Sequence, residues 1–447
     1  MGQDVLRDFL SAHPDIELFE VLLPDLNSRL RGKWLSREHI HQAFEGGLKL
    51  PLTTLGFDIW GRDPESWVFE QGDQDGICVA EGRSLVRVPW LSKPTAQVLM
   101  SLRMASGKPC GYDARDILRH LQQRFLTLGL TPVVALEMEF YLLACDRDSF
   151  GQPTHSQTGV DGRRSLGGQT YGMEQLQDVA PLMHAIRDAC KVQNLPVDTL
   201  ITEAAPSQYE INLYHQTDAL LAADQGLMLQ RLIKGVAKQQ GYLASFMAKP
   251  FGDLAGNGMH VHCSLLDSEE KNVFDDGAGR GSNQLREAVA GCLQTMADAM
   301  AIFSPSINAF RRFQPDSHAP MAAAWGYENR TTALRIPSGS STDRRIEHRV
   351  ASADANPYLV VASVLAGMLN GIARQLVAPP DTKGDAYSQH LPDLPRYLPE
   401  ALARFESSSF IREYFGTEFQ RVFLAAKRQE LAEFDRRVTI LEYDAYL

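Results

Sequence analysis

The chain has 447 residues, a formal net charge of −11, 44% hydrophobic residues and 22% charged residues. This length predicts two domains with a substantial core, and an acidic chain without a basic cluster is a poor partner for nucleic acid or for an anionic membrane surface. Six cysteines are scattered without a CxxC pair and the N-terminal segment has no apolar signal core, so we expect a cytoplasmic protein with reduced thiols.

The first hundred residues predict a small mixed domain. After a short helix, residues 16–35 have the pattern of two strands joined by the polar turn PDLNSR, and residues 65–81 (ESWVFEQGDQDGICVAE) predict further short strands. A Gly/Pro turn then precedes an amphipathic helical pattern that begins near Tyr112. We therefore place a domain boundary near residue 108, giving domains 1–108 and 109–447.

Two glutamates stand one residue apart in the apolar run PVVALEMEFYLL, residues 132–143. In a helix Glu137 and Glu139 would lie about 200° apart, whereas in a strand they share one face, with Leu136 and Met138 on the other. Two ionised carboxylates at this spacing repel each other by about 2 to 3 kcal/mol at an effective dielectric near 20. Either a positive group lies between them, or this face of the strand is simply solvated.

The same alternation recurs in three later segments. Glu203 and Glu210 lie in EAAPSQYEINLYH, His260, His262 and Ser264 alternate in GMHVHCSLL, and Arg345, Glu347 and Arg349 alternate in RRIEHRV. Each segment alone is explained by a solvated face or by a core histidine. Together, five glutamates and a histidine on neighbouring strands of one curved sheet predict a cluster of mainly oxygen ligands, which suits magnesium or manganese.

Arginines flank the same segments. Guanidinium groups bind phosphates and carboxylates bidentately, and five are placed to do so: Arg312, Arg330, Arg335, Arg345 and Arg349. Divalent metal ions combined with arginines indicate phosphoryl transfer to or from an acidic substrate.

The motifs LEMEF, EAAPSQYE, GNGMHVHCSL, NRTTALRIP and RRIEHRVASADANPYL, in this order, resemble the glutamine synthetase family along nearly the whole chain. The segment DLNSRLRGKWL is similar to the signature of the family's small N-terminal domain. The resemblance implies an α+β fold, with an N-terminal β-grasp-like domain and a large catalytic domain whose curved antiparallel sheet is flanked by helices. It also implies a homo-oligomeric ring, a hexamer or a dodecamer, with active sites at the subunit interfaces.

The resemblance also implies roles for individual residues. Glu139, Glu203 and Glu210 would hold one Mg²⁺ or Mn²⁺ ion and Glu137, His260 and Glu347 a second, with two or three ions per site. Arg312, Arg349 and the backbone at Gly256 would bind glutamate, while His262 and Ser264 would contact ATP. Arg330, Arg335 and Arg345 would bind the phosphates or the adenosine side of ATP, and Arg330 and Arg335 would share the catalytic role with His318. The implied reaction forms γ-glutamyl phosphate from glutamate and ATP, and an amine then displaces the phosphate.

The acceptor site departs from the pattern of family members that use ammonia. Those enzymes have a flap glutamate and an aspartate in a DGSS-like loop, whereas here His318 occupies the flap position and Asp58 is the candidate replacement for the aspartate. Ala255 also replaces an expected asparagine. These differences predict an amine larger than ammonia, either a polyamine or an apolar or aromatic monoamine.

Three aromatic residues, Phe57, Trp60 and Trp67, lie on the loop that is expected to approach the acceptor site, where they would contact the amine or simply pack within the small domain or the subunit interface. Three other functions are weighed against an amine ligase. The chain would be a true glutamine synthetase, a zinc amidohydrolase if MHVH is a zinc motif, or an inactive structural ring protein.

Overall fold

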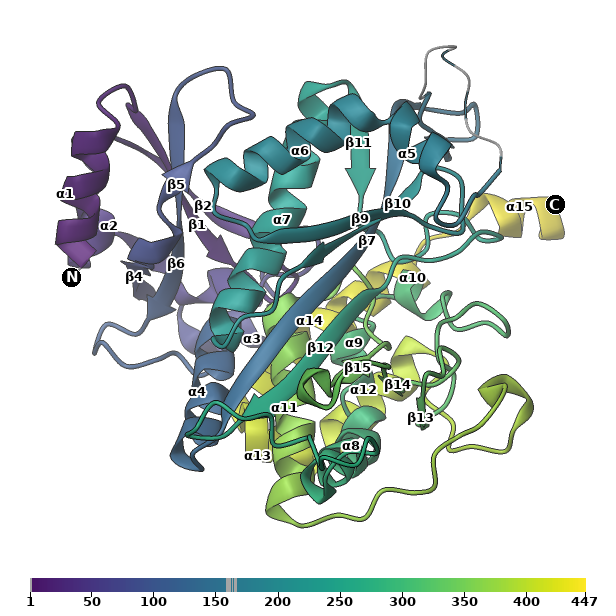
Figure 1. Cartoon of the computed structure of the whole chain (residues 1–447). Coiled ribbons are helices and arrows are strands. Elements are labelled where there is room, and N and C mark those ends of the chain that lie inside the picture. The colour runs from purple at the N-terminus through teal and green to yellow at the C-terminus, as the bar shows by residue number, and fades with distance from the viewer. Residues whose placement is uncertain (1, 158–161, 163, 165–166) are drawn as a thin grey trace.

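Two β-sheets form the framework of the protein in a computed structural model that describes residues 2–157, 162, 164 and 167–447 (Figure 1). Strands up to residue 103 form a six-stranded sheet, and strands from residue 131 onward form a nine-stranded sheet. Residue 108 falls between the last strand of the first sheet and the next helix, so it lies between the two sheets. The exact division into domains stays a prediction.

The first sheet has the strand order β2-β1-β6-β4-β3, and β5 also pairs with β6. β1 is parallel to β6 and antiparallel to β2, which confirms the two strands predicted within residues 16–35. The strands are β1 (Leu18–Pro24), β2 (Leu30–Ser36), β3 (Lys49–Pro51), β4 (Asp75–Ala80), β5 (Val86–Arg87) and β6 (Thr95–Arg103).

The strand prediction for residues 65–81 is half wrong. Helix α3 (Glu65–Gln71) occupies the first part, and only β4 is a strand. Pro64 precedes the first turn of α3, where its fixed φ suits a helix start. Trp67 is buried against Tyr112, with 5.3 Å between the ring centroids, so tertiary packing outweighs the β-propensity of this aromatic segment.

The second sheet has the order β13-β14-β15-β12-β7-β10-β9, and β8 and β11 also pair with β7. All of its described pairs are antiparallel except β13 with β14. The strands are β7 (Thr131–Arg147), β8 (Pro153–His155), β9 (Val197–Thr202), β10 (Gln208–Leu213), β11 (Tyr242–Ser245), β12 (Met259–Leu266), β13 (Trp325–Tyr327), β14 (Leu334–Ile336) and β15 (Ile346–His348).

Strand β7 crosses the centre of this sheet and has two chemically different faces (Figure 1). Leu136 and Met138 are buried beneath helix α7 (Ala219–Gln239), where Gly226 allows a close approach because an added Cβ would lie 2.5 Å from the Leu136 side chain. Glu137 and Glu139 lie on the other face. The alternation in the sequence therefore predicted the orientation of the strand correctly.

Helices complete the core around both sheets. Helix α4 (Ala114–Thr127) begins at the Asp113 cap, matching the amphipathic pattern from Tyr112, and α11 (Pro357–Ala373) is buried along nearly its whole length. Within the described residues, no helix is both long and apolar enough to cross a membrane. The remaining helices are α1 (Gly2–Ala12), α2 (His41–Glu45), α5 (Met173–Asp178), α6 (Ala180–Val192), α8 (Asn283–Met296), α9 (Met300–Phe303), α10 (Ile307–Phe310), α12 (Leu398–Ser407), α13 (Ser409–Phe415), α14 (Thr417–Asp435) and α15 (Ile440–Tyr446).

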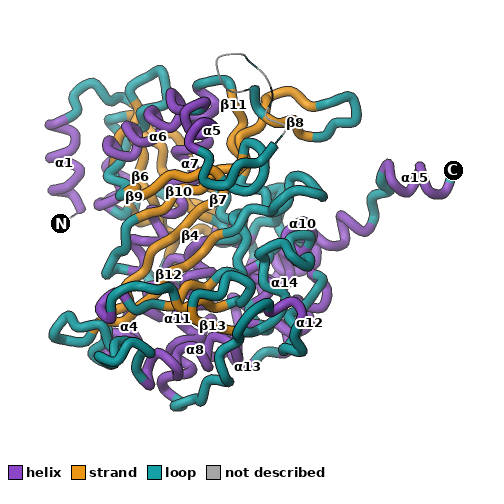
Figure 2. The backbone as a smooth tube through the Cα atoms, turned by 45° about the vertical axis from the view of Figure 1, so that its right-hand side comes forward, coloured by secondary structure: helices purple, strands orange, loops and turns teal. Residues whose placement is uncertain are grey.

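The C-terminal helix α14 is joined to the first sheet by a buried polar network. Lys427 contacts both Asn27 and Glu430, with 2.9 Å between Lys427 Nζ and Glu430 Oε2. Glu430 in turn accepts a hydrogen bond from the backbone N–H of Ile59 at 2.9 Å. This network fixes the 57–62 loop against α14, whereas α15 projects from the body of the protein (Figure 2).

Candidate active site

The strand register brings the predicted metal ligands into one row across the sheet. His260 on β12 lies opposite Glu137 on β7, and Glu210 on β10 lies opposite Glu139 on β7. On the other side of β12, His262 lies opposite Glu347 of β15. Four adjacent strands therefore place carboxylates and imidazoles on a common face.

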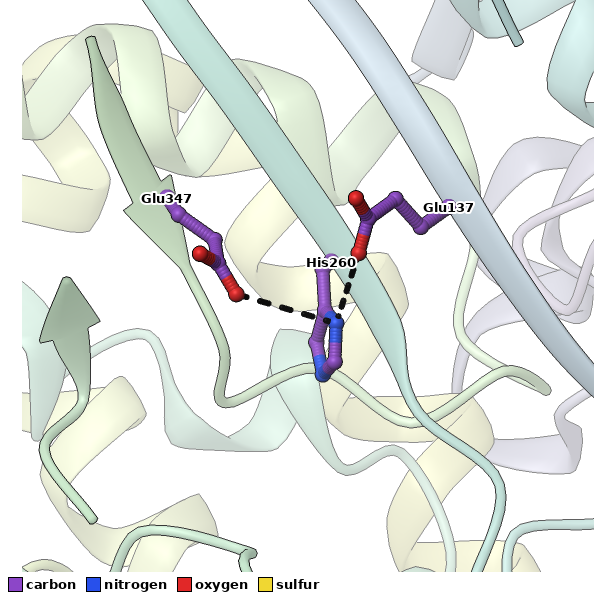
Figure 3. A group of neighbouring side chains, drawn as sticks. All are labelled: Glu137, His260 and Glu347. Carbon is purple, nitrogen blue, oxygen red and sulfur yellow. Dashed lines mark hydrogen bonds and ion pairs between the residues drawn. The ribbon is translucent and has the colours of Figure 1, made fainter. Parts of the chain in front are cut away.

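Two groups within this row have the spacing of metal ligands. Glu137, His260 and Glu347 offer ligand atoms that all lie within 4.8 Å of one another, and so do Glu139, Glu210 and His260. In the first group, His260 Nδ1 lies 3.1 Å from Glu137 Oε2 and 4.0 Å from Glu347 Oε1 (Figure 3). The side chains converge from three different strands, as a shared ion requires.

The first group has the composition that the resemblance implies, but the second differs from it. His260 joins Glu139 and Glu210 where Glu203 was expected. Glu203 follows the end of β9, in the turn before β10, and is half-buried. The cluster still affects the Glu203 carboxyl group electrostatically. Burial is the largest influence and the charge of Glu139 is the next, and together they raise the pKa of Glu203 to about 7.

The charges of the cluster are unbalanced. Burial, followed by the charges of Glu137 and Glu139, raises the pKa of Glu210 well above its ordinary value. Burial opposes ionisation of Glu137 as well, but His262 and His260 outweigh it and hold the Glu137 pKa well below its ordinary value. A carboxylate-rich, buried set with this excess of negative charge fits a divalent ion, and its oxygen donors favour Mg²⁺ or Mn²⁺ over zinc.

Both ring nitrogens of His262 have hydrogen-bond partners. Arg345 Nε donates to His262 Nδ1 at 3.0 Å, so the ring carries its proton on Nε2 and donates it to Glu137 Oε1 at 2.7 Å. His262, Arg345 and Ser264 also line a cavity of about 350 Å³ next to the metal-ligand row. This cavity is the candidate nucleotide site.

Two arginines contact Glu347, at the β15 end of the row of predicted metal ligands. Arg335 pairs with Glu347 at 2.7 Å, and Arg349 pairs with the other oxygen of Glu347. Although burial disfavours its charge, the pKa of Glu347 is lowered to about 2, with Arg349 as the largest favourable influence. Nε of both arginines is buried and has no hydrogen-bond partner among the described residues, so each has an N–H group available for a ligand.

Arg312 and Gly256 lie together, as the predicted glutamate site requires. Arg312 is buried and donates to the Val350 carbonyl at 3.0 Å. A Cβ added at Gly256 would lie 2.6 Å from Arg312 Cγ and 2.7 Å from the Ala248 carbonyl oxygen. Only glycine therefore fits against Arg312 at this position.

Two predicted catalytic residues lie outside the cluster of predicted metal ligands. Arg330 and His318 are both exposed on loops, and His318 has a left-handed backbone conformation with φ of 57°. Neither side chain makes a hydrogen bond or an ion pair with a described residue. Their catalytic roles stay predictions.

Asp58 does not supply a free acceptor-site carboxylate. Its side chain is fully buried and accepts hydrogen bonds from Arg62 Nε at 2.8 Å and from Gln429 Nε2 at 2.9 Å. Of the three aromatic residues near this loop, Trp67 belongs to the core in α3, which corrects its placement on the loop. Trp60 is 43% exposed and packs on Phe434, with ring centroids 5.6 Å apart.

Sequence patterns did not identify Glu328 as part of the site. Its carboxylate lies 3.3 Å from Arg335 and also accepts a hydrogen bond from the Ser338 backbone. The segment WGYENR offered a signal, since this glutamate directly precedes the NRTTALRIP motif. The pairing itself depends on how β13 and β14 lie side by side.

A larger cavity, of about 750 Å³, lies elsewhere, between β11, α7 and α14. It contains none of the predicted site residues, and most of its lining is apolar. The convergence of titratable groups locates the chemistry at the smaller cavity, because size alone does not supply metal ligands.

Comparisons with known proteins identify the family of the chain. The family described as glutamine synthetase, catalytic domain, matches residues 111–446. The chain is 37% identical over 448 residues to the gamma-glutamylputrescine synthetase PuuA of Escherichia coli (strain K12), covering 99% of this chain and 94% of that protein. It is 33% identical over 451 residues to the gamma-glutamylethanolamide synthetase GlnA4 of Streptomyces coelicolor (strain ATCC BAA-471 / A3(2) / M145), covering 98% and 94%.

Solved structures share the fold. GmaS in complex with ADP superposes with a TM-score of 0.86, covering 99% of each chain at 24% identity. This likeness confirms the predicted α+β architecture. Since the family match and both relatives extend over most of the chain, the protein belongs to the glutamine synthetase family.

Proposed function

We propose that the protein is an ATP-dependent ligase that joins the γ-carboxylate of glutamate to an amine larger than ammonia. Glutamate, ATP and the amine become a γ-glutamyl amide, ADP and phosphate. Family membership supports the use of ATP and divalent metal ions. The named activities of the two relatives, on putrescine and on ethanolamine, support an organic amine as the acceptor.

The proposal for a larger amine rests on the burial and the hydrogen bonds of Asp58. Capture and deprotonation of ammonium call for a free carboxylate at the acceptor site. Asp58 is buried and bonded to Arg62 and Gln429, and the flap carries His318 instead of a glutamate. A neutral histidine accepts a proton near pH 7 without attracting ammonium as strongly as a carboxylate does.

Each part of the site has a proposed task. Glu137, His260 and Glu347 would hold one divalent ion, and Glu139 and Glu210, with Glu203 nearby, would hold a second. When bound, the ions would neutralise charge on the transferred phosphoryl group. Arg312, Arg349 and the backbone at Gly256 would bind glutamate.

The remaining residues would act on the nucleotide and the amine. His262 and Ser264 would contact ATP, while Arg330, Arg335 and Arg345 would bind its phosphates or the adenosine side, since guanidinium groups match phosphate geometry. His318 would accept the proton that the attacking amine loses. We also propose a ring-shaped homo-oligomer in which a neighbouring subunit completes each site.

The alternatives have less support. Each potential metal group among the described residues contains one histidine, whereas a zinc amidohydrolase would use several. An inactive ring protein would not need six metal-ligand positions to retain ligating side chains. A true glutamine synthetase remains the direct competitor.

The test is phosphate release with ATP, Mg²⁺ and glutamate across ammonium, polyamines, alkyl amines and aromatic amines, with mass spectrometry of the products. We expect a γ-glutamyl amide of an organic amine and little glutamine. Glutamine as the main product would overturn the proposed acceptor class while leaving the ligase reaction intact.

A further inference from the structure

Asn212 belongs to the same row as the metal ligands, although no part of the proposed function uses it. It lies on β10 two residues after Glu210, so both side chains point to the same face of the sheet. In the strand register it stands opposite Glu137. Directly opposed residues have Cβ atoms about 4.5 to 5.5 Å apart, so Asn212 adjoins two predicted ligands.

The two ends of the Asn212 amide are in different situations. The NH₂ group acts on Glu210, because a hydrogen bond from the Asn212 side chain favours the charged form of that carboxyl and partly opposes the rise in its pKa. Oδ1 is buried and has no hydrogen-bond partner among the described residues. A buried amide oxygen without a donor is rare in folded proteins, because it has lost its hydrogen bond to water without replacement.

The groups around Asn212 cannot supply the missing donor. Glu137 is an acceptor, and Glu210 becomes one when a divalent ion replaces its proton. The nearby His262 already donates its single ring proton to Glu137. Asn212 also lines the cavity of about 350 Å³ that is the candidate nucleotide site. The donor must therefore enter from outside the chain, and the surrounding carboxylates select for one that carries positive charge.

We propose that Asn212 is a positioning residue of the metal site. Its NH₂ group orients the Glu210 carboxylate, and its Oδ1 accepts a hydrogen bond from a water molecule bound to the divalent ion. Such a water is a strong donor, and Mg²⁺ and Mn²⁺ commonly keep several waters when bound to proteins. The inference requires the proposed metal site but is independent of the identity of the amine.

The experiment measures Mn²⁺ binding without substrates, using electron paramagnetic resonance to quantify the free ion, together with the melting temperature of the metal-free protein. For Asn212→Ala we expect Mn²⁺ affinity to fall by about 10- to 100-fold, the usual effect of removing a partner of a metal ligand. The metal-free melting temperature should change little, because losing the hydrogen bond from the NH₂ group to Glu210 is offset by removing a buried oxygen that lacks a partner. Thr217→Val is the matched control, because Thr217 lines the same cavity on its exposed rim.

A second variant separates the two ends of the amide. Asn212→Asp keeps an oxygen acceptor and loses the donor to Glu210, so Mn²⁺ affinity should exceed that of Asn212→Ala by at least about tenfold. The inference is overturned if Asn212→Ala binds Mn²⁺ within twofold of the parent protein. It is also overturned if weaker binding comes only with a matching loss of metal-free stability, which would indicate a purely structural role.

Mn²⁺ binding by the parent protein distinguishes a failure of the proposed metal site from a failure of the role of Asn212. If it binds no Mn²⁺, the proposed metal site fails and the role of Asn212 fails with it. If it binds Mn²⁺ tightly and the variants do so equally, only the role of Asn212 fails.

Discussion

His262 Nε2 lies 2.7 Å from Glu137 Oε1 and donates its proton to that carboxylate. Arg345 donates to the other ring nitrogen, so the orientation of the imidazole is fixed from both sides. A carboxylate held in this way keeps its second oxygen directed at His260. In the proposed site, His262 would therefore orient the predicted metal ligand Glu137 before any nucleotide is bound.

Replacing His262 with alanine should weaken Mn²⁺ binding by about 10- to 100-fold, because Glu137 loses the group that orients it. Isothermal titration calorimetry of the substrate-free protein measures this effect. In a double-mutant cycle, adding His262→Ala to Glu137→Gln should cost much less than His262→Ala alone. Additive losses would show that His262 does not act through Glu137.

Metal affinity should depend on pH through Glu203, whose pKa is raised to about 7. Since Mn²⁺ competes with the proton on Glu203, this group should lower the affinity by up to about tenfold per pH unit as the pH drops below 7, in addition to the pH dependence that Glu210 contributes through its own raised pKa. Titrations between pH 5.5 and 8.5 measure the slope. Glu203→Gln should flatten it, and an unchanged slope in that variant would contradict the assignment.

The same carboxyl group makes the opposite contribution to the stability of the metal-free protein. Its pKa in the folded state lies above the ordinary value of 4.5, so the folded state holds the proton more tightly than the unfolded state does. This stabilisation is fully present below pH 4.5 and is lost as the pH rises through 7. The difference in urea-unfolding free energy between the parent protein and Glu203→Gln should follow that trend.

His318→Glu should raise phosphate release with ammonium by about tenfold or more, because a flap carboxylate attracts and deprotonates ammonium. The rate with organic amines should fall in the same variant. His120→Glu adds the same charge at an exposed position of α4 and is the control. If His318→Glu gains no ammonium activity, loop geometry and not flap chemistry selects the acceptor.

Gly256→Ala should raise the KM for glutamate by about tenfold or more and leave the affinity for ATP within about twofold. An added methyl group would lie 2.6 Å from Arg312 Cγ, and well-packed groups yield to such a clash only by moving. Steady-state kinetics with each substrate varied in turn test the split. Gly252→Ala is a suitable control because its Cβ would meet nothing within 4 Å.

The sequence predicted which face of the sheet the proposed metal ligands share better than it predicted which of them lie around one ion. Alternation in β7 correctly placed Glu137 and Glu139 on one face, because the period of a strand is a local property. The neighbours of Glu203 were harder to predict, since the turn before β10 sets where this side chain lies. The pairing of His260 with both groups depends on the register between β12 and β7, which a single chain does not reveal.

Long-range packing explains the errors in the first sheet. Trp67 and its neighbours have strong β-propensity, yet α3 forms because Trp67 is buried against Tyr112. Asp58 seemed available as an acceptor-site acid, but Gln429, 371 residues away in the sequence, occupies its carboxylate. Contacts of this kind leave no local pattern in the sequence.

The contact between Lys427 and Asn27 has a consequence for biosynthesis. The two residues are 400 positions apart, so about 20 to 80 s of translation separates them at 5 to 20 residues per second. During that time Glu430 is absent and the backbone of Ile59 lacks its partner. The 57–62 loop thus acquires its final anchorage only after nearly the whole chain has been made, and nascent chains that stop before α14 would carry every predicted metal ligand and still lack this anchorage.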